Sequence, residues 1–407
     1  MDLVQARASF PGLREATFLD SACVGIAPAQ AAHAVEEVAR RGAQCEERDA
    51  SEHHLALDGL RDGARSEAAT LLGAGEDEVA LVESTTQGLS VAALAIPFEP
   101  GDNVVIADLE FLQVAIPFVK LAEQGRIAEV RLARNEGGAL TTEAFARVMD
   151  EHTRAVVVSS VQWCNGYRID LGALGALCRS AGVLLVVDAI QELGALRMDV
   201  GETPVDLLTA GGHKWLNAPY GCGVLYISRE TLPLLRQPWW GYLAMDPPGD
   251  GWPAYFADPA STPLRPYEFP AVARAFETGG TANYPGAAAL AASLALVNEL
   301  GADTAERRVL ELSARLRDEI EVLGYELVSH PEAPSAITTF RSSPEMEDDQ
   351  RLLAELLDER ILVSIRYTSG VGGIRVSTHY YNDESDLDRL VSALRRLRRR
   401  SVSRPAA

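Results

Sequence analysis

Lysine is almost missing from this chain of 407 residues. Only Lys120 and Lys214 occur among its 37 basic residues, so the other 35 are arginine. A guanidinium stays protonated and delocalised, and arginine therefore cannot form an imine with an aldehyde. A lysine amine can do so once its surroundings lower its pKa. Lys214 lies in the glycine-rich stretch 209–215 and is the first candidate for covalent chemistry. The alternative is an ordinary surface lysine, and the residues around Lys214 decide between the two.

Cysteine is also scarce, and long apolar runs are missing. The five cysteines are dispersed, with no CxxC pair and no spacing typical of a metal site. This excludes a disulfide framework and predicts reduced thiols in a reducing compartment. The N-terminal residues contain no apolar run typical of a signal peptide, and no segment approaches 18 uninterrupted apolar residues. We therefore expect a cytoplasmic protein that does not span a membrane.

Positive charge is in deficit, since the net charge is -21. Proteins that bind nucleic acid or anionic membranes do so through a positively charged surface, so we expect neither partner here. The basic stretch 395–400 is explained by its favourable position at the C-terminal end of a predicted helix. The global charge says little about the substrate, because a local cluster of residues can oppose it.

Apolar runs rich in Val, Ile and Leu alternate with amphipathic stretches, which predicts an α/β fold with a large, doubly wound, mostly parallel sheet. After about residue 245 the pattern changes to long helices separated by short strands. We predict a large domain over 16–260 and a smaller α+β domain over 285–400 together with 1–15. The predicted strands of the large domain are 78–83, 103–107, 154–160, 183–188, 206–209 and 223–228, and its predicted helices include 88–95, 112–124, 142–150 and 171–181.

Three polar groups follow predicted strands of the large domain. Asp188 ends one strand, and Lys214 comes 26 residues later, after the next strand. Ligands of open α/β sheets bind beyond the carboxyl ends of strands, so the two side chains can meet in one crevice. A carboxylate paired with an imine-forming lysine is the protein half of a pyridoxal phosphate site. The stretch 84–88, Ser-Thr-Thr-Gln-Gly, opens a predicted helix and could hold the phosphate, with a plain helix cap as the alternative.

Several motifs in order along the chain resemble those of the class V aminotransferase family. This is the fold type I group of pyridoxal phosphate enzymes that includes cysteine desulfurases, kynureninase, C–S lyases and isopenicillin N epimerase-like enzymes. The resemblance runs from about residue 18 to about residue 390. Its motifs are Phe18-Leu-Asp-Ser-Ala22, Asp188-Ala-Ile-Gln191, Gly212-His-Lys214, Glu277-Thr-Gly-Gly-Thr-Ala-Asn-Tyr284 and Ile374-Arg-Val-Ser-Thr-His-Tyr-Tyr-Asn382.

The resemblance implies a role for each matching residue. Lys214 would carry the cofactor covalently and move protons at the substrate α-carbon, while Asp188 would bond the pyridine nitrogen. Arg375 would hold the substrate α-carboxylate through a bidentate pair. A homodimer is implied, because Gly280 and Thr281 would reach the phosphate in the partner subunit. The other implied cofactor contacts are Thr85, Thr86 and His213 at the phosphate, Gln191 near the phenolic oxygen, and Phe111 stacked on the ring.

The sequence departs from the family pattern at positions that choose the reaction. Residues 330–370 contain no cysteine, so the desulfurase nucleophile is missing unless Cys23 replaces it. Trp163 stands where many relatives have Asn at the phenolic oxygen, and Gln162 or Asn165 could take over that contact. The aromatic stretch 239–242 is expected either to line the substrate channel or to pack in the core.

We therefore predict an enzyme that deprotonates an amino acid at its α-carbon, with transamination needing least beyond these residues. A C–S or C–Se lyase that eliminates a β-substituent is an alternative. An epimerase is another, and its second acid or base could be His53, His54, His379, Tyr380 or Tyr381. A protein that binds the cofactor without turnover is the alternative from a different class.

Overall fold

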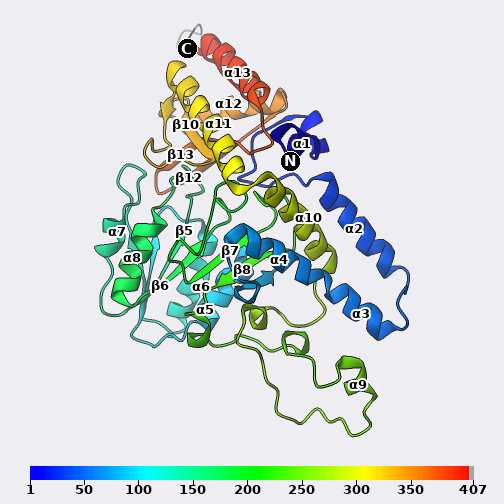
Figure 1. Cartoon of the computed structure of the whole chain (residues 1–407). Helices are drawn as coiled ribbons and strands as arrows, with labels where there is room; N and C mark the ends of the chain where they lie inside the picture. The colour runs from blue at the N-terminus through cyan, green and yellow to red at the C-terminus, as the bar shows by residue number, and fades with distance from the viewer. Residues whose placement is uncertain (403–407) are drawn as a thin grey trace.

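A seven-stranded sheet forms the centre of the computed structural model, which describes residues 1–402 (Figure 1). Its strands β3, β5, β6, β7 and β8 are buried along their length, apart from one partly exposed residue in β5, as their Val, Ile and Leu content requires. In sheet order the strands are β2 (Val79–Val82), β8 (Gly223–Ile227), β7 (Leu207–Gly211), β6 (Leu184–Asp188), β5 (Thr153–Ser159), β3 (Asn103–Ala107) and β4 (Glu129–Ala133).

Four of the pairings in this sheet are parallel, and only β8 runs antiparallel to its two neighbours. The predicted mostly parallel sheet is therefore confirmed. The edge strand β4 was not predicted, because charged residues and partial exposure dilute its apolar pattern.

Helices bury both faces of the sheet. On β5, Ala155 and Val157 pack with residues of α5 and α6, whereas Val156 and Val158 pack with residues of α4, α8 and α10. Each fully buried valine contributes roughly 1.5–3 kcal/mol relative to an exposed one. The helices of this part of the chain are α1 (Leu3–Ala8), α2 (Ala29–Gly42), α3 (Ala50–Asp58), α4 (Leu60–Leu72), α5 (Thr85–Ala95), α6 (Leu112–Glu123), α7 (Thr142–Ala146), α8 (Leu171–Ala181), α9 (Trp252–Ala257) and α10 (Tyr284–Leu300).

A second sheet of four antiparallel strands lies beyond the main one, and α11, α12 and α13 pack against it through a separate apolar cluster (Figure 1). Its strands in order are β12 (Ser364–Thr368), β13 (Val371–Ser377), β10 (Ile337–Arg341) and β9 (Glu326–Leu327). The helices are α11 (Ala302–Val322), α12 (Met346–Asp358) and α13 (Glu384–Val402).

The N-terminal segment 17–25 connects the second sheet to the main one. Its strand β1 (Thr17–Phe18) pairs in parallel with β11 (Ile361–Leu362), and the N–H of Ser377 donates to the carbonyl oxygen of Leu19 at 2.8 Å. Seven residues past β1, the N–H of Gly25 donates to the carbonyl oxygen of His213 at 2.7 Å. The domain boundaries stay a prediction, but β1 itself is paired with the C-terminal part of the chain.

No single helix among residues 1–402 has the length and apolar character that crossing a membrane requires. Only α10 and α11 taken together reach that length and composition, across a bend of 80°.

Candidate active site

Lys214 lies in the turn that follows β7, at the carboxyl edge of the main sheet. The turn closes on itself, since the N–H of Asn217 donates to the carbonyl oxygen of Lys214 at 3.2 Å, and Asn217 has a positive φ of 56°. Burial lowers the pKa of the Lys214 amine to about 8, although Asp188 opposes this and Arg375 adds to it. An appreciable part of this amine is therefore neutral, and nucleophilic, near neutral pH.

Asp188 is the last residue of β6, and only 3 % of its surface is exposed. Burial raises the pKa of its carboxyl group to about 6, against a hydrogen bond from the N–H of Ile190 to Oδ1 at 2.9 Å and the charge of Lys214. The other oxygen, Oδ2, has no hydrogen-bond donor among the described residues. Asp188 and Lys214 line one cavity of about 360 Å³, the size of a small-molecule site.

The predicted phosphate cup lines the same cavity, beside the N-terminus of α5. Ser84 caps this helix, because its hydroxyl accepts the N–H of Gln87 at 3.2 Å. Thr85 is buried, and its Oγ1 accepts the N–H of Gly211 at 2.8 Å, which leaves the hydroxyl hydrogen free to donate. Thr86 and His213 also line the cavity, and the His213 ring stacks on Tyr220 at 5.5 Å.

Arg375 reaches the cavity from β13 of the second sheet, and 1 % of it is exposed. Its Nη1 donates to the carbonyl oxygen of Trp163 at 2.9 Å, and its Nη2 donates to Oδ1 of Asp20 at 3.2 Å. Its Nε is buried without a partner among the described residues. An arginine held in this way is preorganised for a carboxylate.

Two further predicted cofactor contacts line the cavity. Gln191 is buried, with Nε2 donating to the carbonyl oxygen of Ala22 at 3.1 Å and Oε1 accepting the Trp215 indole N–H at 2.9 Å. Phe111 is 41 % exposed, and its ring meets Trp163 edge-on at 5.3 Å. The Phe111 ring is therefore open to a ligand on its exposed side.

Other predicted contacts lie away from this cavity. Gln162 is buried, but its amide donates to Glu110 at 2.9 Å, and it is not among the lining residues. Asn165 is turned toward the carbonyl oxygen of Gly138 at 2.8 Å. Thr281 is exposed and contributes nothing to the cavity of its own chain.

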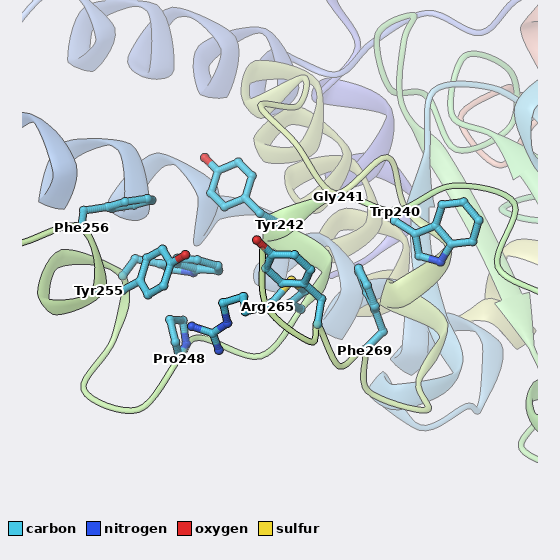
Figure 2. Close-up of a pocket in the computed structure, with 11 residues that line it drawn as sticks. Trp240, Gly241, Tyr242, Pro248, Tyr255, Phe256, Arg265 and Phe269 are labelled. Atoms are coloured by element: carbon cyan, nitrogen blue, oxygen red, sulfur yellow. The ribbon is translucent and has the colours of Figure 1, made fainter. Parts of the chain in front are cut away.

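The aromatic stretch 239–242 does not line this cavity either. Trp239 donates its indole N–H to the carbonyl oxygen of Glu277 at 2.8 Å. Trp240 and Tyr242 line a different hollow of about 780 Å³ with Trp252, Tyr255 and Phe256 (Figure 2). The two cavities have no lining residue in common, so these aromatic side chains say nothing about the substrate of the Lys214 site.

Sequence reasoning missed several residues at the site. Ser159 and Arg366 line the cavity, and Glu110 lies behind it, accepting the Ser159 N–H at 2.8 Å. Burial raises the pKa of Glu110 to about 7 in spite of this bond and those from the Ser159 hydroxyl and Gln162. The missed signal was that Ser159 ends β5 as Asp188 ends β6, and the two are paired in register.

A family model described as "Aminotransferase class-V" matches residues 17–249 and 255–390. The chain belongs to the class-V aminotransferase family. The predicted membership, fold type I architecture and dependence on pyridoxal phosphate are thereby confirmed.

Class-V relatives of known or assigned activity cover most of the chain. A probable cysteine desulfurase of Methanothermobacter thermautotrophicus is 26 % identical over 95 % of this chain and 96 % of its own length. An isopenicillin N epimerase of Amycolatopsis lactamdurans is 28 % identical over 82 % of this chain and 84 % of its own. The solved cystine C–S lyase C-DES, in complex with cysteine persulfide, has a TM-score of 0.82 at 22 % identity, covering 95 % of this chain and 99 % of its own. The last likeness shows the fold alone.

The residues of the class-V site fit the cofactor chemically. Asp188 keeps one oxygen without a protein donor, the Lys214 amine has a lowered pKa, and hydroxyl and backbone donors gather at the N-terminus of α5. When bound, pyridoxal phosphate supplies an aldehyde for amines and a ring that withdraws electrons from the substrate α-carbon. Lys214 would hold its aldehyde carbon and Asp188 its pyridine nitrogen. Its phosphate would be held by Ser84, Thr85, Thr86 and His213.

Proposed function

We propose that this enzyme is an aminotransferase for an α-amino acid. Arg375 holds the substrate carboxylate, Asp188 keeps the pyridine nitrogen protonated, and the Lys214 amine moves the proton between the α-carbon and the cofactor. The observation that carries the proposal is that Lys214, Asp188 and Arg375 line one cavity, where burial also lowers the pKa of the Lys214 amine to about 8. A general base is most effective when its pKa lies near the working pH.

The surroundings of the cavity argue against epimerisation, which needs a second acid or base on the opposite face. None of the five predicted candidates lines the cavity. His53 contacts Glu47 at 2.6 Å and His54 contacts the Tyr284 hydroxyl at 3.0 Å, whereas His379 is buried between Trp215 and Tyr381. Because none of these candidate second acids or bases reaches the cavity, its lining supports transamination over epimerisation.

The test loads the protein with pyridoxal phosphate and supplies each amino acid with and without a keto-acid acceptor. Transamination gives one equivalent of keto acid without acceptor and continuous turnover with it. Pyruvate and sulfide formed from cysteine without any acceptor would instead show β-elimination, and a change of optical rotation alone would show epimerisation. Lys214→Ala should lower turnover at least a thousandfold, while Lys120→Ala, which removes the exposed second lysine, should not change it.

We further propose a cytoplasmic homodimer in which Gly280 and Thr281 reach the partner's phosphate. In support, Thr281 is exposed and lies outside the cavity of its own chain. Thr281→Glu would then repel the phosphate and inactivate the enzyme. A mixed dimer of Thr281→Glu and Lys214→Ala chains should recover activity, because one of its two sites is intact only if Thr281 serves the other subunit. Failure of this mixture to recover activity contradicts the arrangement.

A further inference from the structure

The hairpin of β12 and β13 places two arginines on one face. Ser364 of β12 lies opposite Arg375 of β13, and Arg366 follows two residues after Ser364. Directly opposite residues, and residues two apart in a strand, point to the same side of a sheet. Arg366 and Arg375 are therefore diagonal neighbours, about 7–8 Å apart at the backbone. Both line the cavity that contains Lys214.

Arg375 forms an ion pair with a carboxylate, whereas Arg366 does not. Oδ1 of Asp20 accepts from Arg375 at 3.2 Å and also from the Ser364 hydroxyl at 2.8 Å. Within the described part of the chain, the Arg366 guanidinium donates only to the carbonyl oxygen of its neighbour Ile365 and to the Cys23 sulfur at 3.3 Å. Among the residues whose side chains the structure describes, no carboxylate forms an ion pair with Arg366. A half-buried guanidinium facing a cavity without a counter-charge favours an anionic ligand there.

We propose that the substrate is an α-amino acid whose side chain ends in a carboxylate, with the α-carboxylate on Arg375 and the distal carboxylate on Arg366. This inference rests on the proposed function and names its substrate class. The two carboxylates of one substrate fit two guanidinium groups held as diagonal neighbours. An amide or apolar side chain would leave the charge of Arg366 unmatched in the loaded site.

The backbone around Arg366 holds this geometry firmly. A Cβ on Gly372, whose φ is 146°, would lie 2.0 Å from the carbonyl oxygen of Arg366, so only glycine allows this close pairing. Arg341 donates to the carbonyl oxygens of Gly372 and Gly370 at 2.9 and 2.7 Å. At the hairpin tip, the Ser369 hydroxyl donates to the carbonyl oxygen of Asp108 at 2.7 Å, which joins the hairpin to the main sheet.

The test measures binding without reaction, using the protein loaded with pyridoxal phosphate. Calorimetry compares glutarate with pentanoate, which has the same chain length but one carboxylate. Glutarate should bind at least tenfold more tightly. Arg366→Gln should remove this difference, Arg366→Lys should retain part of it, and Arg229→Gln, an exposed arginine paired with Asp77, should leave it unchanged. In turnover, the preference for glutamate over glutamine should fall at least tenfold in Arg366→Gln.

Equal affinities for glutarate and pentanoate in the unsubstituted enzyme would overturn the inference. So would an Arg366→Gln protein that loses affinity for pyridoxal phosphate but keeps its preference for glutamate, since Arg366 would then serve the cofactor. Glutarate binding that depends on Arg366 supports the inference even if no keto acid forms with any amino acid. That last result would contradict the aminotransferase proposal alone.

Discussion

Gly25 lies directly against the backbone of Lys214. A Cβ at position 25 would come 2.0 Å from the carbonyl oxygen of Lys214, and the Gly25 N–H donates to the carbonyl oxygen of His213 at 2.7 Å. The same N-terminal segment also contacts the second sheet, because the N–H of Ser377 in β13 donates to the carbonyl oxygen of Leu19 at 2.8 Å. The position of the reactive lysine is therefore fixed in part by residues that precede it by almost 190 positions.

Gly25→Ala should displace the Lys214 turn, because a methyl group has no space beside that carbonyl. We expect about 1–3 kcal/mol lower stability and at least tenfold weaker binding of pyridoxal phosphate, measured by urea unfolding and by absorbance titration. Gly63→Ala is the matched control. Its Cβ would lie 4.0 Å from that of Ala291, and alanine should stabilise helix α4 by about 0.5–1 kcal/mol. Unchanged cofactor affinity in Gly25→Ala would contradict the argument.

The rate at which the cofactor-free protein captures pyridoxal phosphate should depend on the Lys214 amine. Burial lowers its pKa from 10.5 to about 8, and only the neutral amine attacks an aldehyde. The capture rate should therefore rise with pH and level off above about 8, as followed by stopped-flow absorbance. Lys120→Ala should give the same profile. A rate still rising steeply at pH 10 would mean that Lys214 has the pKa of an exposed lysine.

Glu110 should make the cofactor-free protein less stable as pH rises. Its folded pKa, about 7, lies above the ordinary value of 4.5, so between these values the unfolded chain ionises while the folded chain holds the proton. Stability contributed by Glu110 is thus present below pH 4.5 and lost as pH approaches 7, by roughly 3 kcal/mol at most. Asp188, raised to about 6, acts in the same direction.

Glu110→Gln tests this directly, because a neutral amide cannot ionise. Its stability relative to the unsubstituted protein, from urea unfolding, should increase steadily between about pH 4.5 and 7. Glu83→Gln, an exposed residue near the same edge of the sheet, should show no such trend. A difference between Glu110→Gln and the unsubstituted protein that does not change with pH would show that Glu110 ionises normally.

Thiol reagents should distinguish the cysteines by position. Cys23 and Cys45 are exposed, whereas Cys164, Cys178 and Cys222 are buried, and burial raises the pKa of each of those three thiols to about 12. Iodoacetamide should therefore modify only the first two.

Modification of Cys23 should block amino-acid binding, because its sulfur lies in the cavity beside Arg366. Cys23→Ser should make the enzyme resistant to iodoacetamide, whereas Cys45→Ser should not. Mass spectrometry of the modified peptides, alongside residual turnover, measures both. Inactivation that persists in Cys23→Ser would place the sensitive group elsewhere.

The pattern of apolar residues along the chain was enough to predict the main sheet and the edge at which Asp188 and Lys214 lie. The strand 103–107 was predicted with the bounds that the structure has, because buried parallel strands are continuous apolar runs. Asp188, Lys214 and Thr85 line one cavity, as expected for residues at the carboxyl ends of strands that run in the same direction in one sheet. These relations depend only on the order of strands and on their direction.

What could not be predicted depends on pairing between distant segments. Arg366 enters the site only through the register of β12 with β13, which no local signal sets. Gln162 was expected near the cofactor, but its amide is bonded to Glu110, a carboxylate 52 residues earlier. In the same way, Trp240 and Tyr242 come after the last strand of the main sheet, β8, but line another hollow (Figure 2).

Lys214 follows β7 of the main sheet, whereas both arginines that line the cavity lie in β12 and β13 of the second sheet. In the proposed site, an amino acid whose nitrogen is at Lys214 and whose carboxylate is at Arg375 would connect the main sheet with the second one. Substrate binding should therefore stabilise the whole chain, because the binding free energy adds to the free energy needed to separate the two sheets. A saturated enzyme should resist proteases and heat even at places far from its substrate.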